Sequence, residues 1–238
     1  MAGNLTRYSY WQLRDFIRER GYALLITSTL LGFTLVMPLR AMYGANMSVD
    51  SAKQILMLAL PQVVPIAAFI TLNGLVSTDR KLGYYKFLFS KPVSIPAYYA
   101  QYFIVCLVGF LLTFALLFGV FAFVVRPVNP IGALTYCALV YLSLGGIGFL
   151  ISSLFRYDWP ILAGVYLGSA LLNQLWGMSE GWRHWVTNLL PPLHELSPAL
   201  KSIMTTGSAD TKSIVWLLGY SAIFFVAGLI VLWKRPIG

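Results

Sequence analysis

Long apolar segments alternate with short polar ones along the whole chain. Each apolar segment is close to or above the roughly 20 residues that an α-helix needs to cross a bilayer. Strands of a membrane barrel are shorter and alternate in polarity, and in hydrocarbon each segment must satisfy its own backbone groups. The pattern therefore predicts an all-α membrane protein with six transmembrane helices. The predicted spans are residues 22–39, 54–76, 98–125, 131–154, 160–176 and 213–233.

Composition supports a membrane protein. Of the 238 residues, 58% are hydrophobic and only 11% are charged, which lies outside the range of soluble domains. Residues 1–21 carry several charges and no short apolar core, so we expect the first span to be a retained anchor and not a cleaved signal peptide. We expect one transmembrane domain over residues 1–238.

The distribution of Lys and Arg predicts the orientation. With the N-terminus inside, the inner segments hold 11 of these residues and the outer segments hold 6, over nearly equal lengths. Cytoplasmic segments of membrane proteins are enriched in Lys and Arg, so we expect both termini to be cytoplasmic and the protein to lie in the cell (inner) membrane. This topology accounts for the net charge of +9, and no motif indicates binding to nucleic acid.

Residues 1–21 predict an amphipathic helix that ends at Gly21 and lies at the cytoplasmic headgroups. Its arginines Arg7, Arg14 and Arg18 share one face and would meet anionic lipid or a protein. A simple membrane anchor with no docking role is an equally open interpretation. The apolar residues of the opposite face are Leu5, Tyr10, Leu13, Phe16 and Ile17.

Two other segments carry structural expectations. Residues 177–212, on the outer side, are too apolar for a free loop but contain three prolines, so we expect two short re-entrant helices that dip into the outer leaflet. Gly145, Gly146 and Gly148 in the fourth span predict a seam of close helix packing.

Asp, Glu, Lys, Arg and His are absent from all six predicted spans. A proton-driven transporter is therefore disfavoured, because proton relays use such residues, and so is an intramembrane Ser–His hydrolase. His184 and His194 lie in the outer segment, where surface histidines are the simpler interpretation than a metal site. No Lys follows a Gly, so the usual phosphate-binding loop is missing. We expect no catalysis and no cofactor in this chain, and energy for any uphill transport would come from another subunit.

Residues 77–93, STDRKLGYYKFLFSKPV, lie in the largest segment predicted to be cytoplasmic between two spans. Ser77 to Asp79 can begin a helix and Pro92 can end it, which leaves about three turns. Aromatic and aliphatic residues fall on both sides of this helix, so it is suited to contact the membrane bundle on one side and a cytoplasmic partner on the other. An amphipathic connector that only places its basic residues at the headgroups is the alternative.

The order of these elements resembles the type 2 ABC exporter permeases. The match is concentrated in Ser-x-Asp-Arg-x-x-Gly followed by Leu-Phe-Ser-Lys-Pro-Val-Ser at residues 77–94, with a weaker one in NLLPPLHELSPAL at 188–200. The resemblance implies a half-transporter that pairs with a second permease copy or homologue. It also implies two ABC ATPase subunits, which bind Mg-ATP and dock on the coupling helix at residues 77–93. The coupling residues implied are Asp79, Arg80, Gly83, Tyr84, Phe87 and Lys91.

Uncharged polar residues within or at the ends of spans are candidates for a translocation path. With the aromatic residues Phe110, Phe114, Phe118 and Tyr166, they would suit an amphipathic or lipid-like substrate, although hydrogen bonding between helices is an alternative role. A non-transporting scaffold that couples an ATPase to assembly of an envelope complex, or a passive channel, remains an alternative function. The candidate path residues are Gln62, Asn73, Gln101, Asn173 and Gln174.

Overall fold

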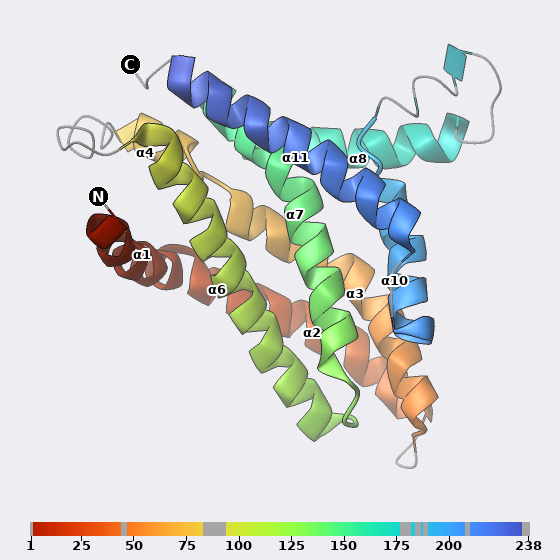
Figure 1. The fold of residues 1–238 in the computed structure, drawn as a ribbon. Helices are drawn as coiled ribbons and strands as arrows, with labels where there is room; N and C mark the ends of the chain where they lie inside the picture. Colours follow the sequence, from red (N-terminus) through yellow and green to blue (C-terminus); the bar gives the residue numbers. More distant parts are fainter. Residues whose placement is uncertain are drawn as a thin grey trace.

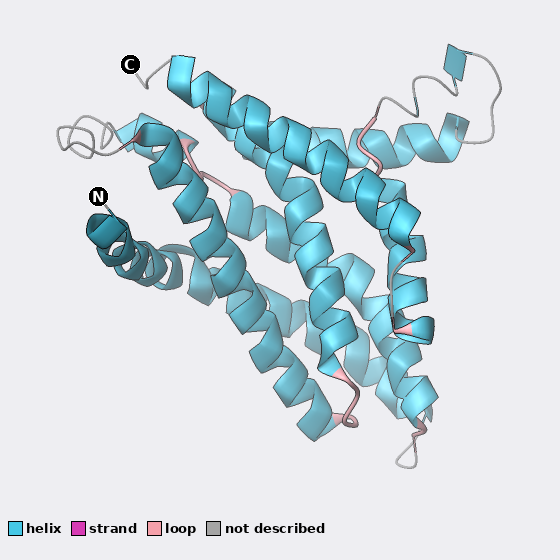
Figure 2. Cartoon of the chain, viewed as in Figure 1, coloured by secondary structure: helices cyan, strands magenta, loops and turns pink. Residues whose placement is uncertain are grey.

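The computed structural model is a bundle of helices, and its described residues contain no strand (Figures 1 and 2). Side chains are described from Tyr8 onward, apart from those of Tyr43, Arg80 and Leu82 within their helices. The residues that the structure describes are 2–43, 47–82, 94–176, 182–183, 187, 190–207 and 210–234.

Five helical segments among the described residues are long and apolar enough to cross a membrane, which is the pattern of a multi-pass membrane protein. They contain five of the six predicted spans. The helices that carry these spans are α2 (Tyr22–Tyr43), α3 (Val49–Leu72), α6 (Ile95–Val124), α7 (Pro130–Leu154) and α11 (Thr211–Lys234).

The sixth predicted span is also helical, as α8 (Trp159–Trp176), but its 18 residues are not among the segments found apolar enough to cross a membrane. Asn173 and Gln174 near its C-terminal end make this helix more polar. That α8 crosses the membrane stays a prediction.

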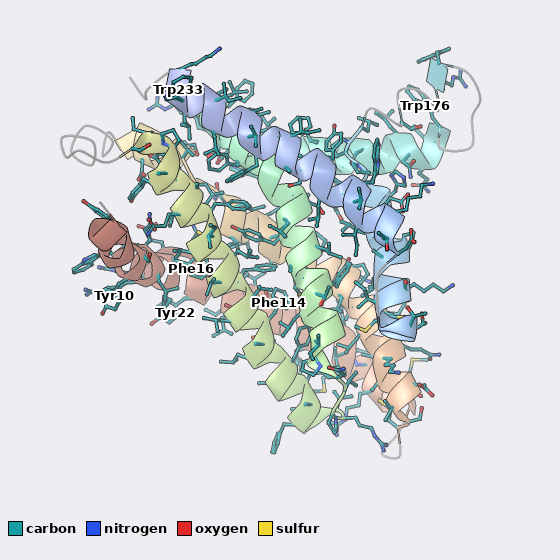
Figure 3. The ribbon with its side chains drawn as sticks, in the orientation of Figure 1. Tyr10, Phe16, Tyr22, Phe114, Trp176 and Trp233 are labelled. Atoms are coloured by element: carbon teal, nitrogen blue, oxygen red, sulfur yellow. The ribbon has the colours of Figure 1, made fainter. Side chains whose placement is uncertain are left out.

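The N-terminal segment differs from the sequence expectation. The prediction that Gly21 ends a separate helix is wrong, because α1 (Ala2–Phe16) continues through a π-helical turn, Ile17–Gly21, into α2. The predicted apolar face is also divided. Phe16 is buried, and its ring packs against Gly109 of α6, where no side chain is in the way. Tyr10 and Ile17 are exposed (Figure 3).

Helix α7 lies at the centre of the bundle and packs most extensively against α11. The predicted glycine seam is confirmed: a side chain at Gly146 would collide with Ser221 of α11, and one at Gly145 would meet Phe103 of α6 at 2.7 Å. On α11, Gly228 admits the ring of Phe149 in the same way. Small residues therefore let α7 approach both neighbours closely.

Segments predicted to be cytoplasmic gather at one end of the bundle. In Figure 1 the start of α1, the short helix α4 (Ser77–Leu82) and the end of α11 all lie toward the upper left. The end of α2, the start of α3 and residues 125–129 lie at the lower end. Helices α2, α3, α6 and α7 thus run in alternating directions between these two ends.

One predicted boundary needs correction. Helix α3 ends at Leu72, and residues 73–76, predicted to be the end of a span, form a turn. In the outer segment residues 182–183 and 187 are helical, and α10 (Leu196–Thr206) follows a short 3₁₀ turn, Leu193–Glu195. The two short re-entrant helices expected there stay a prediction. Buried leucines of α10 pack it against α7 and α3. Residues 177–181, 184–186, 188–189 and 208–209 of this segment lie outside the described part of the chain.

Candidate functional site

The turn between α3 and α4 brings the predicted coupling segment onto the bundle. Gly74 in this turn has a left-handed backbone, with φ of 73°. A Cβ at this position would collide with the hydroxyl of Thr78, so glycine is required both by conformation and by space. This turn fixes the direction in which α4 leaves the bundle.

Two side chains from the end of α7 and the following loop hold the turn. Asp158 Oδ2 accepts a hydrogen bond from the Gly74 backbone N–H at 2.9 Å. Ser152 Oγ accepts bonds from the N–H groups of Val76 at 3.0 Å and Ser77 at 3.1 Å. Both side chains are buried, and they satisfy backbone donors that no helix bonds satisfy.

Arg20 holds the same region from the other side. It is buried in the π-helical turn, and its Nη1 donates to the backbone oxygen of Thr71 at 2.8 Å, near the end of α3. The guanidinium lies 5.4 Å above the ring centroid of Tyr102 and 3.9 Å from Cys106 Sγ, both on α6. A buried charge needs such partners, and it ties the N-terminal helix to the end of α3.

Helix α4 is itself bonded to its neighbours. Tyr99 of α6 donates its hydroxyl hydrogen to Asp79 Oδ2 at 3.1 Å. Lys81 Nζ lies 4.9 Å from the ring centroid of Tyr157, in the loop that contains Asp158. We call this set of contacts the α4 anchor. Its residues are Arg20, Thr71, Gly74, Val76, Ser77, Asp79, Lys81, Tyr99, Ser152, Tyr157 and Asp158.

The α4 anchor connects α4 with α6 and with the α7–α8 loop, and it connects the end of α3 with the α1–α2 junction. Its hydrogen bonds are mostly buried, where such bonds are strong and costly to break. A displacement of α4 would therefore move the ends of several membrane-spanning helices together.

Of the predicted coupling residues, Asp79 and Arg80 lie on α4, and only the Asp79 side chain is described. Gly83, Tyr84, Phe87 and Lys91 lie outside the described residues, so the two-faced helix expected there stays a prediction.

The predicted basic face of the N-terminal helix is present in part. Arg14 and Arg18 are exposed, and the Arg14 guanidinium lies 5.5 Å from the ring centroid of Trp11. The side chain of Arg7 lies outside the described part of the structure. The two described arginines are thus available at the end of the bundle where the α4 anchor lies.

The residues predicted to line a translocation path do not lie together around one cavity. Gln62 is exposed beside α2 and donates to Leu58 O of its own helix at 3.3 Å. Gln101 donates to Ser9 Oγ at 2.6 Å and so joins α6 to α1. Asn73 is exposed in the α3–α4 turn, while Asn173 and Gln174 lie at the far end of α8. The position of Gln101 therefore fits its alternative role, a hydrogen bond between two helices.

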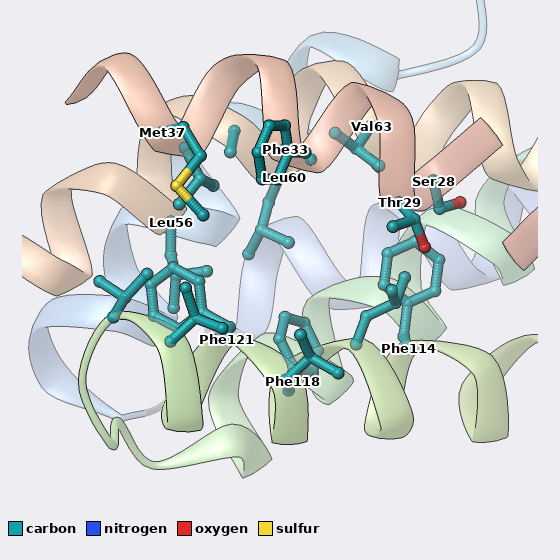
Figure 4. Close-up of a pocket in the computed structure, with 17 residues that line it drawn as sticks. Ser28, Thr29, Phe33, Met37, Leu56, Leu60, Val63, Phe114, Phe118 and Phe121 are labelled. Carbon is teal, nitrogen blue, oxygen red and sulfur yellow. The ribbon is translucent and has the colours of Figure 1, made fainter. Parts of the chain in front are cut away.

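An apolar groove of about 310 Å³ opens between α2 and α6, with α3 as its floor (Figure 4). Phe114 and Phe118 of α6 line it, and Phe110 continues the same stack of rings deeper in the core, with Phe110 and Phe114 centroids 4.9 Å apart. Tyr166, grouped with them from the sequence, instead packs on Phe69, with centroids 5.3 Å apart.

The sequence does not predict which side chains from other parts of the bundle hold α4. Arg20 was assigned to an interfacial helix, and Tyr99, Ser152 and Asp158 were not singled out. One signal was available for Asp158, because it is an acidic residue in a very short connection between two apolar segments. Nothing in the sequence pairs it with Gly74.

Among the described residues, no group of three or more His, Cys, Asp or Glu side chains could hold a metal ion. Cys106 and Cys137 are both buried and unpaired. Comparison of the chain with protein-family models, with curated proteins and with solved structures finds no match in any of the three.

Proposed function

We propose that this chain is the membrane-spanning permease subunit of an ATP-driven ABC exporter, with six spans and cytoplasmic termini. Two permease chains would form the path, and each would dock on a separate ATPase subunit through residues 77–93. The single observation that supports this most is the α4 anchor. A loop that only connects two spans does not need buried bonds to three other parts of the bundle.

The α4 anchor suits the transmission of force. When the ATPases close on Mg-ATP, they would displace the coupling segment, which begins at Ser77. Asp158 and Ser152 would pass this displacement to α7 and α8, and Arg20 would pass it to α1 and α2. Opening of the path would follow from movement of these helices as rigid elements.

The substrate class follows from what the membrane segments lack. The predicted spans carry no Asp, Glu, Lys, Arg or His, and the rings of Phe110, Phe114 and Phe118 form an apolar row along α6. Such a bundle is better suited to an uncharged or amphipathic molecule than to an ion.

Purification of the chain from its native membrane in a mild detergent tests the proposal. We expect an ATPase subunit to co-purify and to turn over Mg-ATP, and we expect Arg80→Glu combined with Lys91→Glu to remove both. The matched control is Lys201→Glu with Lys212→Glu, which makes the same charge change in the outer segment. A chain that purifies alone and without ATP turnover would exclude the exporter and favour the scaffold or channel.

A further inference from the structure

The groove between α2 and α6 lies entirely within predicted spans. Its lining belongs to α2, α3 and α6, and apart from Ser28 and Thr29 every lining residue is apolar. Helix α2 packs mainly on α3 and has little contact with α6, which leaves the groove open on one side. In Figure 4 the side chains of Phe33, Leu60 and Phe118 face the space between the helices.

The groove has the length of one bilayer leaflet. From Ser28 to Met37 on α2, and from Phe114 to Val125 on α6, it extends over about 14 to 16 Å at the usual helical rise of about 1.5 Å per residue. The hydrocarbon core of a bilayer is about 30 Å thick, so one leaflet contributes about half of that. The molecule that surrounds a groove at this depth is membrane lipid.

Two arginines flank the outer mouth of the groove. Arg40 lies on α2 one turn beyond Met37, and Arg126 directly follows Val125. Arg126 Nη1 donates to the backbone oxygen of Met47, which holds its guanidinium at the mouth. The nearby acid Asp50 is paired with Lys53, with 3.8 Å between Oδ1 and Nζ. Guanidinium groups bind phosphate oxygens well.

We propose that this groove binds one phospholipid of the outer leaflet. One acyl chain lies along α3 between α2 and α6, and the phosphate group lies between Arg40 and Arg126. The acyl chain fills the space where α2 makes little contact with α6, so the bound lipid holds α2 against the bundle. Lipid binding at this site is independent of any ATPase partner.

Gly32 allows a test that leaves the backbone in place. It lines the groove, and a Cβ added there would meet no atom within 4 Å. Gly32→Leu therefore places an apolar side chain in the groove where the backbone leaves room for its Cβ. Gly119→Leu is the matched control, because Gly119 on α6 has equally free space but does not line the groove. A second pair is Val120→Phe inside the groove and Val108→Phe outside it on the same helix.

The measurement is native mass spectrometry of the full chain, freed of lipid in detergent and titrated with phosphatidylglycerol. We expect the unmodified chain and both control variants to bind one lipid, and Gly32→Leu and Val120→Phe to bind at least tenfold more weakly. Arg40→Gln should weaken binding about threefold or more. Equal binding by filled and control variants would overturn the proposal. So would a dimer of the unmodified chain that Gly32→Leu removes, because a second copy would then occupy the groove.

Discussion

The backbone N–H of Gly74 donates a hydrogen bond to Asp158 Oδ2 at 2.9 Å, across 84 positions of sequence. Asp158 Oδ1 also accepts from the N–H of Trp159, at 3.0 Å, so one buried carboxylate begins α8 and holds the turn before α4. Asp158 lies in a segment predicted to be cytoplasmic, whereas Gly74 lies where the second span was predicted to end. The contact therefore links the turn before the coupling segment to the α7–α8 loop.

Replacement of Asp158 by Ala should destabilise the protein. Two backbone N–H groups lose their acceptor, and the buried one, that of Gly74, costs roughly 1–3 kcal/mol when it is left unsatisfied. Asp158→Asn keeps one acceptor oxygen and should cost less. Thermal unfolding in one detergent measures both, with Asp50→Ala, an exposed acid, as the control. An Asp158→Ala chain as stable as the Asp50→Ala chain would show that the bond to Gly74 contributes little.

Gly74→Ala should be more destabilising than Gly207→Ala. Both glycines have left-handed backbones, with φ of 73° and 79°, so each substitution costs roughly 1–2 kcal/mol in conformation. Only at Gly74 does the new Cβ also collide with Thr78, while Gly207 has free space. The difference between the two unfolding midpoints therefore reports the collision, and equal midpoints would mean that Thr78 moves away freely.

The sequence predicts the helices well because apolar length alone specifies a membrane span. Five predicted spans coincide with long apolar helical segments, and the seam at Gly146 follows from the preference for small residues where helices approach. The continuation of the helix through Gly21 was not predictable in this way. Burial of Phe16 and Arg20 against α6 favours the π-helical turn there, and those are tertiary contacts.

The α4 anchor was less accessible to prediction than the spans. Its position followed from the interruption at residues 77–93, because charges break an otherwise apolar pattern. Its hydrogen bonds were not predictable, because nothing in the sequence distinguishes Ser152 and Tyr99 from other residues near the ends of apolar segments. Only the folded chain places backbone N–H groups beside Ser152 and Asp79 beside Tyr99. Pairings over such separations depend on how the helices pack, which periodicity does not specify.

Tyr99→Phe should reduce coupling without loss of the ATPase partner. The substitution keeps the buried ring and removes the hydroxyl that donates to Asp79, so α4 loses its bond to α6. If the chain is an exporter subunit, we expect the ATPase to co-purify normally and ATP turnover to fall several-fold. Tyr136→Phe, at an equally buried tyrosine of α7, is the control. Turnover that stays equal in both variants would exclude this contact from the force path.

Two buried serines should respond in opposite ways to replacement by Ala. Ser152 accepts from two backbone N–H groups, so Ser152→Ala should cost at least about 2 kcal/mol. Ser28 is equally buried, but its hydroxyl has no hydrogen-bond partner among the described residues, so Ser28→Ala should leave stability unchanged or raise it by up to about 1 kcal/mol. Thermal unfolding compares them, and a clear loss of stability for Ser28→Ala would reveal a partner for that hydroxyl.

Gly146→Ala should separate α7 from α11. The added Cβ would collide with the backbone carbonyl of Ser221, which cannot turn aside as a flexible side chain can, and Ser221 Oγ already donates to Leu142 O at this crossing. Overpacking of this kind costs about 1–3 kcal/mol or more. Gly219→Ala on α11 meets no atom within 4 Å and should instead stabilise the helix by up to about 1 kcal/mol. The two Gly→Ala substitutions should therefore shift the unfolding midpoint in opposite directions. If the Gly146→Ala chain unfolds no earlier than the Gly219→Ala chain, α7 and α11 can move apart at little cost.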